Sequence, residues 1–392
     1  CQNHISFPLA PSLWISAHGR TRNRKDLNQM KNARDAVVVA FGRSPMARAN
    51  KGSFANMHPV EYSAQTLMGV LDRLPGLDRD KIDDVIMGCA TPEGECFFNI
   101  ARLVAQRAGL SDDVTGQTVN RFCSSGLQAI ATAANAIMAG QMDIVVAGGV
   151  ERMTGMNMNP NMANTDAKLI EMKPDTYIPM GMTAENVAAK YGITREEMDQ
   201  MAVESHAKAA AAQAAGKFKP EIIPITVEID GKEVVVTEDE GIRPGTTLEG
   251  LAKLKPCFKP DGVVTAATSS QMTDGASFLV LMAREVAEKL GYKPIAKFVG
   301  FAVGGVPAGL MGLGPIKAVP KVMAKTGLTV DDMDVIELNE AFAAQALACI
   351  RDLKFPYERV NPNGGAMALG HPMVRHRHLR SEERRVGKEC RS

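Results

Sequence analysis

Val119-Asn120-Arg121-Phe122-Cys123-Ser124-Ser125-Gly126-Leu127 is the stretch that decides the fold of this chain. Residues 118–121 are predicted to form a short strand and residues 125–139 a helix rich in small side chains, so Cys123 lies at the apex of a strand-to-helix turn. The N–H groups and the positive dipole end of that helix are expected to lower the pKa of the Cys123 thiol. Cys123 is therefore a candidate nucleophile; the alternative is a buried cysteine that packs near a helix start.

The segments around this turn alternate between strand and helix patterns. Short apolar runs predict buried strands at 36–40, 82–88, 144–149 and 278–281. Helical periodicity predicts helices at 60–74, 96–109, 183–190, 195–215 and 283–290. The stretch 151–270 is more polar and rich in loops, with a strand pair around Gly231-Lys232. The pattern indicates an α/β fold.

The second part of the chain is similar to the first. Residues 328–340 read Leu-Thr-Val-Asp-Asp-Met-Asp-Val-Ile-Glu-Leu-Asn-Glu, and residues 77–89 read Leu-Asp-Arg-Asp-Lys-Ile-Asp-Asp-Val-Ile-Met-Gly-Cys. Each segment follows a helix and leads through an acidic turn into a strand. We infer two similar α/β halves, each of which presents loops at its strand ends, where open α/β sheets place their sites.

Two further motifs hold polar side chains in turns. Residues 363–372 read Asn-Gly-Gly-Ala-Met-Ala-Leu-Gly-His-Pro, which fixes His371 between Gly and Pro. A neutral imidazole there can take a thiol proton and donate to a developing oxyanion; alternatively, His371 is an ordinary surface-loop residue. Residues 337–343 read Glu-Leu-Asn-Glu-Ala-Phe-Ala. Asn339 either caps a helix or orients a water or donor toward a carbonyl oxygen.

Together these motifs resemble the signatures of the thiolase family. The matching stretches are Cys-Ser-Ser-Gly at 123–126, Gly-Gly-Val-Glu-Arg-Met at 148–153, Asn-Glu-Ala-Phe at 339–342 and the stretch 363–372 that ends in Gly-His-Pro. The resemblance covers residues 35–373 and implies the five-layer αβαβα thiolase fold with two duplicated halves. It also implies that Cys123 becomes acylated, that His371 activates it, and that His371 and a water bound by Asn339 hold the thioester oxygen.

The resemblance also implies where coenzyme A binds, as a substrate and not as a cofactor. The implied CoA contacts are Arg243, Ala266, Ser270 and Phe342, with Met180 lining the acyl end. Arg243 can pair with a nucleotide phosphate or stack on adenine, and its alternative is a surface ion pair. The alternative for Ser270 is a turn or cap hydroxyl. Met180 and Phe342 are expected to be core residues as well as pocket walls.

The sequence before Met180 bears on the substrate. Short-chain acetoacetyl-CoA thiolases often carry His there, whereas this chain reads Pro179-Met180-Gly181. This favours a degradative 3-oxoacyl-CoA thiolase of fatty-acid β-oxidation over a short-chain acetyl-CoA C-acetyltransferase. Two other classes are a decarboxylating condensing enzyme and a non-catalytic lipid-binding relative. The Asn-Glu-Ala-Phe motif argues against the first, and the pair Cys123 and His371 argues against the second.

Composition excludes other partners and site types. The net charge of +1 gives no global field for nucleic acid, and no apolar run approaches the roughly 20 residues of a membrane span. The seven cysteines show no Cys-x-x-Cys spacing and the histidines no metal-ligand spacing, so we predict no metal site and reduced thiols. A cytoplasmic location is favoured over a mitochondrial or peroxisomal matrix. The resemblance to thiolases implies a homodimer or homotetramer as the assembly, with a multifunctional β-oxidation subunit as a further partner.

The two ends of the chain differ from the family pattern. Residues 1–29 start with Cys and contain one acidic residue, which indicates a targeting peptide or translated upstream sequence outside the fold. Residues 374–392 lack amphipathic periodicity, and Cys390 does not lie in the family's Cys-x-Gly loop. We therefore expect an N-terminal domain at 30–292, with a loop subdomain at about 151–270, an incomplete C-terminal domain at 293–373, and a tail foreign to the fold at 374–392.

This departure has a consequence for activity. The family's second cysteine acts as base and acid at the substrate α-carbon, and no residue of this chain is assigned to that role. The chain as written is therefore expected to be inactive, or limited to the first half-reaction.

Overall fold

A computed structural model of the chain describes residues 34–156 and 164–371. The predicted leader at 1–29 and the predicted tail at 374–392 lie outside the described residues, as does Pro372 of the Gly-His-Pro motif.

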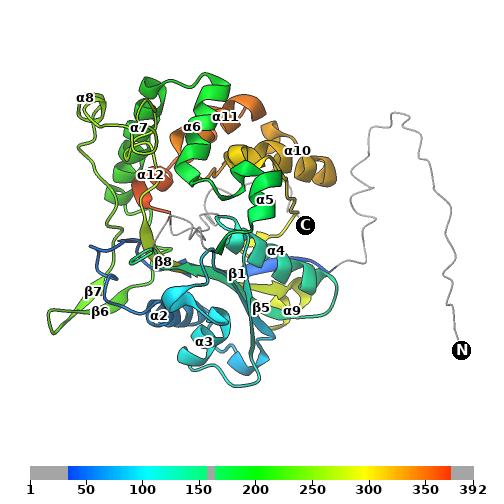
Figure 1. Cartoon of the computed structure of the whole chain (residues 1–392). Helices are drawn as coiled ribbons and strands as arrows, with labels where there is room; N and C mark the ends of the chain where they lie inside the picture. The colour runs from blue at the N-terminus through cyan, green and yellow to red at the C-terminus, as the bar shows by residue number, and fades with distance from the viewer. Residues whose placement is uncertain (1–33, 157–163, 372–392) are drawn as a thin grey trace, which may run out of the picture. The chain divides into compact units, whose positions relative to one another are not determined.

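A mixed sheet of seven strands forms the centre of the first half (Figure 1). Its order is β4-β3-β5-β8-β1-β9, and β2 pairs with β8 off this path. The strands are β1 (Ala36–Arg43), β2 (Ala47–Arg48), β3 (Asp84–Gly88), β4 (Thr115–Val119), β5 (Ile144–Glu151), β8 (Thr273–Ala283) and β9 (Ala296–Lys297). β3, β4 and β5 run parallel, whereas β8 pairs antiparallel with both β5 and β1.

Helices cover both faces of this sheet. On one face lie α2 (Pro59–Leu71) and α3 (Ile100–Arg107), and on the other lies α4 (Ser125–Met138); α9 (Arg284–Lys289) follows β8. Alternate residues of a strand point to opposite faces, so Val37 and Val146 pack toward α2 and α3 while Val38 and Val145 pack toward α4. Burial on both faces explains why β1 and β5 are apolar almost throughout their length.

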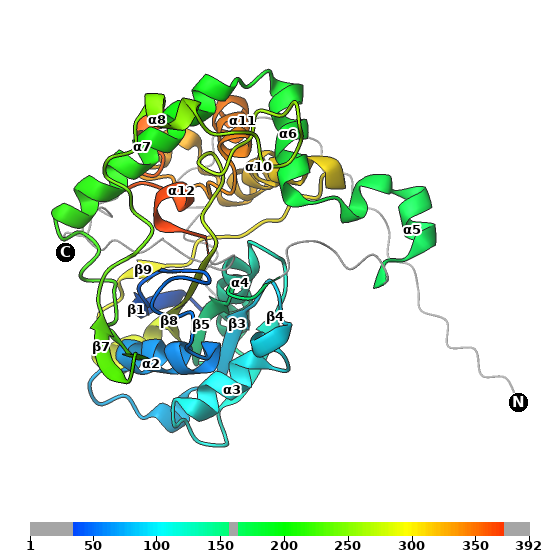
Figure 2. The same cartoon turned by 60° about the vertical axis from the view of Figure 1, so that its left-hand side comes forward.

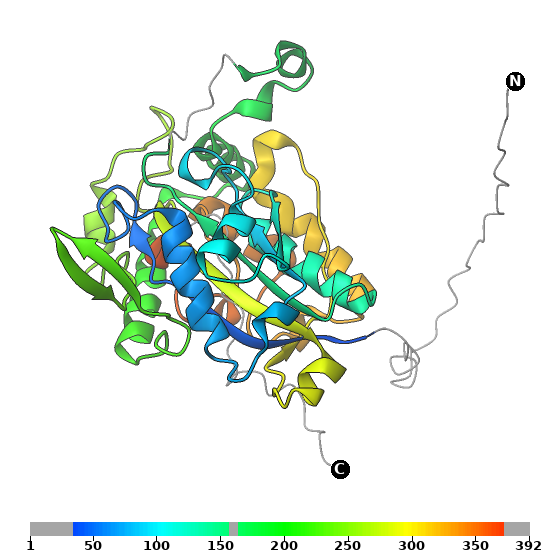
Figure 3. The ribbon, with the colours of Figure 1, turned by 90° about the horizontal axis from the view of Figure 1, so that it is seen from below.

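The stretch between β5 and β8 is mostly helix and loop. It contains α5 (Ala167–Met172), the 3-10 turn η4 (Pro174–Tyr177), α6 (Met180–Tyr191), α7 (Arg195–Ala214) and α8 (Leu248–Ala252). A Thr194–Glu197 capping box starts α7, and Gly192 in the left-handed conformation ends α6. The hairpin of β6 (Ile225–Ile229) and β7 (Lys232–Val236) confirms the predicted strand pair, and Figure 3 shows it at the margin of the ribbon beyond α2.

The second half contributes mainly helices. They are η5 (Ala308–Leu313), α10 (Gly314–Thr326), η6 (Val330–Asp332), α11 (Ala343–Leu353), η7 (Tyr357–Arg359) and α12 (Ala366–Leu369). Residues of α6, α7 and α11 share one apolar core with Leu313, Val360 and Met367. Figure 2 shows α12 between these helices and the sheet. None of the helices in the described ranges is long and apolar enough to cross a membrane.

The repeat within the chain is visible in the order of elements. In the first half α2, the turn η1 (Arg79–Lys81), β3, α3 and β4 follow one another, and in the second half α10, η6, Ile336, α11 and Val360 do the same. Ile336 and Val360 form a parallel bridge, as β3 and β4 do over five residue pairs. The strand expected after the acidic turn of segment 328–340 is therefore reduced to one bridge. The Asn361 side chain takes over part of the ladder by bonding both the N–H and the C=O of Leu338.

Two predicted elements differ in their bounds. The strand predicted at 118–121 is β4, which starts earlier and ends at Val119, because Asn120 and Arg121 enter the turn. The helix predicted at 96–109 is the shorter α3, because the Asn99 side chain caps it by accepting the Arg102 N–H, while Gly94–Cys96 forms the separate turn η2.

Candidate active site

The parallel strands of the sheet end at one edge, beside the start of β8. Gly88 at the end of β3 aligns with Val119 of β4 and with Gly149 of β5. Glu151 at the end of β5 aligns with Gly275, near the start of the antiparallel β8. Loops that leave parallel strands at such an edge are the usual location of a site in an α/β sheet.

Cys123 lies in the turn between β4 and α4, directly before the first turn of α4. The turn is closed by backbone hydrogen bonds from Ser124 N–H to Arg121 O (3.1 Å) and from Ser125 N–H to Phe122 O (2.9 Å). The Cys123 residue is half-buried and packs beside Ala90 and Met153. Met156 and Met180 contact the same small cluster, so Met180 and the candidate nucleophile pack against the same two residues.

The electrostatics of this cysteine differ from expectation. Burial, followed by the nearby charge of Glu151, raises the pKa of the Cys123 thiol to about 12. A helix start alone would lower the pKa, but the apolar cluster and a carboxylate both disfavour a thiolate. The predicted lowering is therefore wrong for the protein without substrate, and this thiol requires a base to react near neutral pH.

His371 and Asn339 are brought together. Asn339 Nδ2 lies 3.3 Å from His371 Nε2, and the His371 backbone N–H donates to Gln271 O at 3.0 Å. His371 is 8% exposed, so it is not a surface-loop residue. Asn339 is exposed, and the residue that precedes α11 as its N-cap is Phe342. Asn339 therefore caps no helix and presents its amide beside the imidazole.

The start of β8 connects this pair to the surroundings of Cys123. A Cβ at Gly370 would lie 2.2 Å from the Thr273 side chain, so the loop that carries His371 touches the first residue of β8. The next residue, Asp274, accepts the Met153 N–H at 2.6 Å, and Met153 belongs to the cluster that contains Cys123. The two halves of the chain thus deliver their motif residues to the same end of β8.

Two buried carboxylates that the sequence analysis did not select support the site. Glu340 accepts Ser205 Oγ–H (2.7 Å), Asn361 Nδ2–H (2.8 Å) and Met367 N–H (3.3 Å), so it ties the loop of Asn339 to the loop of His371. Glu151 accepts the Ala90 N–H (2.8 Å) and ties the end of β5 to the end of β3. Glu151 lies in the motif at 148–153 and Glu340 in the motif at 339–342. Each is a charged residue among apolar ones, and this pattern was the signal in the sequence that could have identified them.

The implied CoA residues occupy two neighbouring loops. Ser270 N–H donates to Ala341 O (2.9 Å), and Phe342 pairs with Ser269 and packs edge-on against Phe258, with ring centroids 5.9 Å apart. Ala266 is exposed in the same loop as Ser270. Ser270 and Phe342 are therefore held side by side.

Arg243 lies in the second loop. Its backbone N–H donates to His206 Nδ1 at 3.1 Å, and burial, followed by the charge of Arg243, lowers the pKa of His206 to about 4, which keeps this acceptor neutral. Gln271 Nε2 donates to Gly241 O (2.7 Å), which links this loop to the residue that bonds His371. The Arg243 side chain is exposed, and no carboxylate within 34–156 or 164–371 forms an ion pair with it, so the ion-pair alternative finds no partner there.

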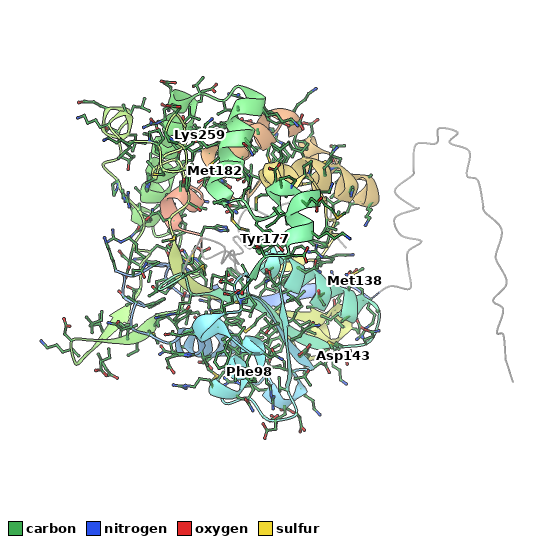
Figure 4. The ribbon with its side chains drawn as sticks, viewed as in Figure 1. Phe98, Met138, Asp143, Tyr177, Met182 and Lys259 are labelled. Atoms are coloured by element: carbon green, nitrogen blue, oxygen red, sulfur yellow. The ribbon has the colours of Figure 1, made fainter. Side chains whose placement is uncertain are left out.

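Figure 4 shows the labelled side chains around this region. Tyr177 and Met182, which precede and follow Met180, lie on the side of α5 and α6, whereas Phe98 lies on the side of α2 and α3. No group of three His, Cys, Asp or Glu side chains in the described part of the chain is arranged to hold a metal ion.

Comparisons with known proteins agree with this arrangement. The thiolase N-terminal domain matches residues 36–285 and the thiolase C-terminal domain matches residues 292–376. The 3-ketoacyl-CoA thiolase of Bacillus subtilis is 47% identical over 349 residues, 87% of this chain and 89% of that protein. A peroxisomal 3-ketoacyl-CoA thiolase A of Mus musculus is 44% identical over 87% of this chain and 82% of its own length.

Solved structures show the same fold. The acetyl-CoA acetyltransferase of Bacillus anthracis superposes with a TM-score of 0.80 at 40% identity, covering 87% of this chain and 89% of that one. Human mitochondrial 3-ketoacyl-CoA thiolase superposes with a TM-score of 0.79 at 34% identity over the same shares. The predicted thiolase fold is thus confirmed, although the second sheet is represented in the described residues by the bridge of Ile336 and Val360. This chain belongs to the thiolase family.

Proposed function

We propose that this chain is a 3-oxoacyl-CoA thiolase, which transfers the acyl group of a 3-oxoacyl-CoA from the α-carbon of its acetyl-CoA part, through Cys123, to the thiol of a second CoA. The observation that carries the proposal is the location of Cys123, in the β4–α4 turn, at the same end of β8 as the contact between Asn339 and His371. Relatives named 3-ketoacyl-CoA thiolase at 42–47% identity support this activity.

The chemistry that these residues support is acyl transfer through a thioester. His371 takes the Cys123 proton, and the sulfur attacks C3 of a 3-oxoacyl-CoA. The C2–C3 bond breaks, acetyl-CoA leaves after C2 gains a proton, and the acyl group stays on Cys123. The thiol of a second CoA then attacks this thioester and restores the Cys123 thiol. Asn339 and His371 stabilise the developing oxyanion; no described residue is assigned to the proton that reaches C2.

The CoA contacts remain those implied by the resemblance. Ser270, Ala266 and Phe342 border the pantetheine path, Arg243 meets the nucleotide, and Met180 lines the acyl end. The packing of Met180 and Cys123 against the same cluster and the pairing of the Ser270 loop with Phe342 support this assignment. CoA is a substrate here, so the proposal requires no cofactor.

A second candidate is an acetyl-CoA C-acetyltransferase. The structural similarity to the Bacillus anthracis acetyl-CoA acetyltransferase favours it, whereas Pro179 before Met180 favours longer acyl chains. Thiolysis of acetoacetyl-CoA and of 3-oxodecanoyl-CoA separates the two, measured on a version of the chain whose C-terminal end carries the family's Cys-x-Gly loop. Comparable or higher kcat/KM for the longer substrate supports the degradative enzyme, and turnover of acetoacetyl-CoA alone supports the acetyltransferase.

Cys123→Ser tests the nucleophile. We expect no acyl label at residue 123 when this variant is mixed with an acyl-CoA, because an alcohol is a far weaker nucleophile than a thiolate. Intact-mass and peptide mass spectrometry measure the label, and exposed Cys257 serves as the control for non-specific acylation. Persistent labelling in this variant would assign the reaction to another residue.

His371→Ala tests the base. We expect acylation of Cys123 to slow by roughly 10²–10⁴, the range for a positioned acid–base group, because burial leaves this thiol with a high pKa. Rapid-quench measurement of acyl-enzyme formation gives the rate. A rate close to that of the wild type would make His371 a structural residue only.

We also propose a second copy of this chain as the main partner. β4 is the last strand of the sheet, and exposed apolar side chains flank it: Phe97, Phe98, Phe122 and Leu127. Asn99 bonds both Gly116 O and Thr118 Oγ1, which holds Phe97 and Phe98 beside the strand. An unpaired edge strand can pair with its own copy in antiparallel orientation. Such a pair supports the predicted homodimer or homotetramer; a multifunctional β-oxidation subunit remains the further partner that we propose.

The expected domain division is part of the proposal. Residues 30–292 carry Cys123, and residues 293–373 carry Asn339 and His371, so each domain contributes to one site. Relatives include bacterial and peroxisomal proteins, and we propose a reducing, cytosol-like compartment. The lack of Cys-x-x-Cys spacing among the cysteines of the sequence favours it.

A further inference from the structure

The residue before Cys123 has an unusual backbone. Phe122 adopts φ +45°, in the left-handed region, although it is a bulky residue with a Cβ. Such a backbone conformation is strained and persists only where the surroundings enforce it. Because the Phe122 backbone leads directly into Cys123, the forces that hold it also determine where the thiol points.

A buried hydroxyl holds this residue from both sides. Ser125 Oγ accepts the Arg121 N–H at 2.8 Å and donates to Phe122 O at 2.6 Å. Ser125 is 0% exposed, and a Cβ at Gly88 of β3 would lie 2.8 Å from its side chain, so it is packed tightly against the sheet. Water cannot replace these bonds without entering a filled space, which makes their loss costly.

A second side chain holds the same residue from the solvent side. Asn120 Oδ1 accepts the Phe122 N–H at 2.8 Å, and Asn120 Nδ2 donates to Ala90 O at 3.0 Å. The Ala90 N–H in turn donates to the buried carboxylate of Glu151. The left-handed residue is thus fixed at its N–H by Asn120 and at its carbonyl by Ser125.

We propose that Ser125 is a positioning residue for Cys123: its hydroxyl keeps Phe122 in the left-handed conformation and so directs the thiol toward the acyl group of the substrate. Asn120 assists from the opposite side of the turn. The inference rests on the proposed function, in which Cys123 is the nucleophile. Without the hydroxyl, Phe122 relaxes to negative φ and the sulfur leaves its reactive position.

Acylation of Cys123 by acetyl-CoA in the full chain measures this positioning. We expect Ser125→Ala to slow acylation by roughly 10- to 100-fold, as small displacements of a reacting group do. Ser124→Ala is the matched control, because that hydroxyl donates to Arg121 O and does not bond Phe122; we expect its rate within about threefold of the wild type. Iodoacetamide labelling of the buried Cys89 and Cys349 reports unfolding in each variant.

The decisive comparison removes the strain itself. Glycine adopts positive φ readily. In a Phe122→Gly background, residue 122 therefore no longer needs the Ser125 hydroxyl to keep its positive φ. We expect Ser125→Ala to slow acylation by less than about threefold relative to Phe122→Gly alone, a coupling that a general structural role would not produce. Asn120→Ala should show the same dependence on background, and because Asn120 is exposed its replacement does not threaten the fold.

The outcomes separate the inference from the function on which it rests. Acylation of the wild type at Cys123, loss in Ser125→Ala and recovery in the Phe122→Gly background support the inference. An unchanged rate in Ser125→Ala, or an equal loss in both backgrounds, overturns it while leaving Cys123 as the nucleophile. If the wild type is not acylated at Cys123, the proposed function fails and the positioning role fails with it. If Ser125→Ala exposes Cys89 or Cys349 to labelling, that variant is unfolded. The test then rests on the acylation rate of Asn120→Ala in the wild-type background compared with its rate in the Phe122→Gly background.

Discussion

Cys123 combines a helix-start position with surroundings that oppose its ionisation. It packs against the apolar side chains of Ala90 and Met153, and Glu151 adds a negative charge nearby. A nucleophile that stays protonated until a base and a substrate arrive is protected from oxidation and alkylation, since only the thiolate reacts. His371, delivered from the other half of the chain, supplies the base under the proposed mechanism.

Glu151→Gln tests how the charge of this carboxylate acts on the thiol. Burial is the larger cause of the raised pKa of Cys123, and Glu151 adds to it. A neutral amide removes the second cause, so the pKa of Cys123 should fall and its labelling by iodoacetamide at pH 8 should rise by roughly 3- to 10-fold. Burial raises the pKa of Glu151 itself, so the effect should disappear at low pH, where the wild-type carboxyl is also neutral.

Peptide-resolved mass spectrometry across a pH series gives this curve. Glu93→Gln, which changes an exposed carboxylate of the β3–α3 loop that Glu151 bonds, is the control. If the two variants give the same Cys123 profile, Glu151 acts on the loop by hydrogen bonding alone.

At the scale of elements, the predictable parts were those with a strong local pattern. β1 and β5 are apolar because both of their faces are covered, and the helices α6 and α7 carry a glycine end and a capping box. The Cys123 turn follows from its motif. The short pairing of Ile336 with Val360 could not be read from the sequence, because a strand's length depends on its neighbours and not on its own residues.

The support of the site was also beyond local pattern. Glu340 and Ser205 are 135 residues apart, yet they share a hydrogen bond. Likewise, the raised pKa of Cys123 depends on burial by residues from three separate loops. Sequence motifs indicated the candidate site residues, whereas the ionisation of these residues depends on contacts that form only in the folded chain.

Gly365→Ala tests the connection between the loops of Asn339 and His371. A Cβ at Gly365 would lie 1.9 Å from Glu340 Cδ, and this carboxylate is held by Ser205 and Asn361, so it cannot move away cheaply. We expect unfolding stability to fall by about 1–3 kcal/mol, as for other overpacked sites, and acylation of Cys123 to slow. Thermal or urea unfolding measures the first effect and rapid-quench labelling the second.

Gly245→Ala is the matched control for this variant, because a Cβ there meets nothing within 4 Å. Stability unchanged in both variants would mean that the Glu340 loop is compliant and does not fix the distance between Asn339 and His371.

At the scale of the whole molecule, the sheet ends in a surface that is unusual for a monomer. Phe98 is 78% exposed and Phe122 57%, and both lie beside β4 (Figure 4 labels Phe98). Both also adopt positive φ, at 64° and 45°. Exposed aromatic side chains beside one edge strand indicate a surface that is suited to contact with another chain.

Phe98→Glu should therefore weaken self-association. If β4 pairs with β4 of a second copy, a charge at Phe98 is buried against apolar surface in each protomer, which opposes assembly. We expect the dissociation constant to rise at least about tenfold, the effect of roughly 1.4 kcal/mol. Sedimentation equilibrium or light scattering over a concentration series measures the change from a dimer of the 42.0 kDa chain toward its monomer.

Val235→Glu, in the β6–β7 hairpin, is the control, because Val235 is as exposed as Phe122 but lies on another element. Because Phe122 directly precedes Cys123, a pairing at this edge would also cover the turn that carries the proposed nucleophile. We therefore expect the acylation rate of Cys123 to fall in Phe98→Glu, as the dimer dissociates, and to remain unchanged in Val235→Glu. A wild-type chain that stays monomeric at every concentration, or equal masses in both variants, would place the contact between copies elsewhere.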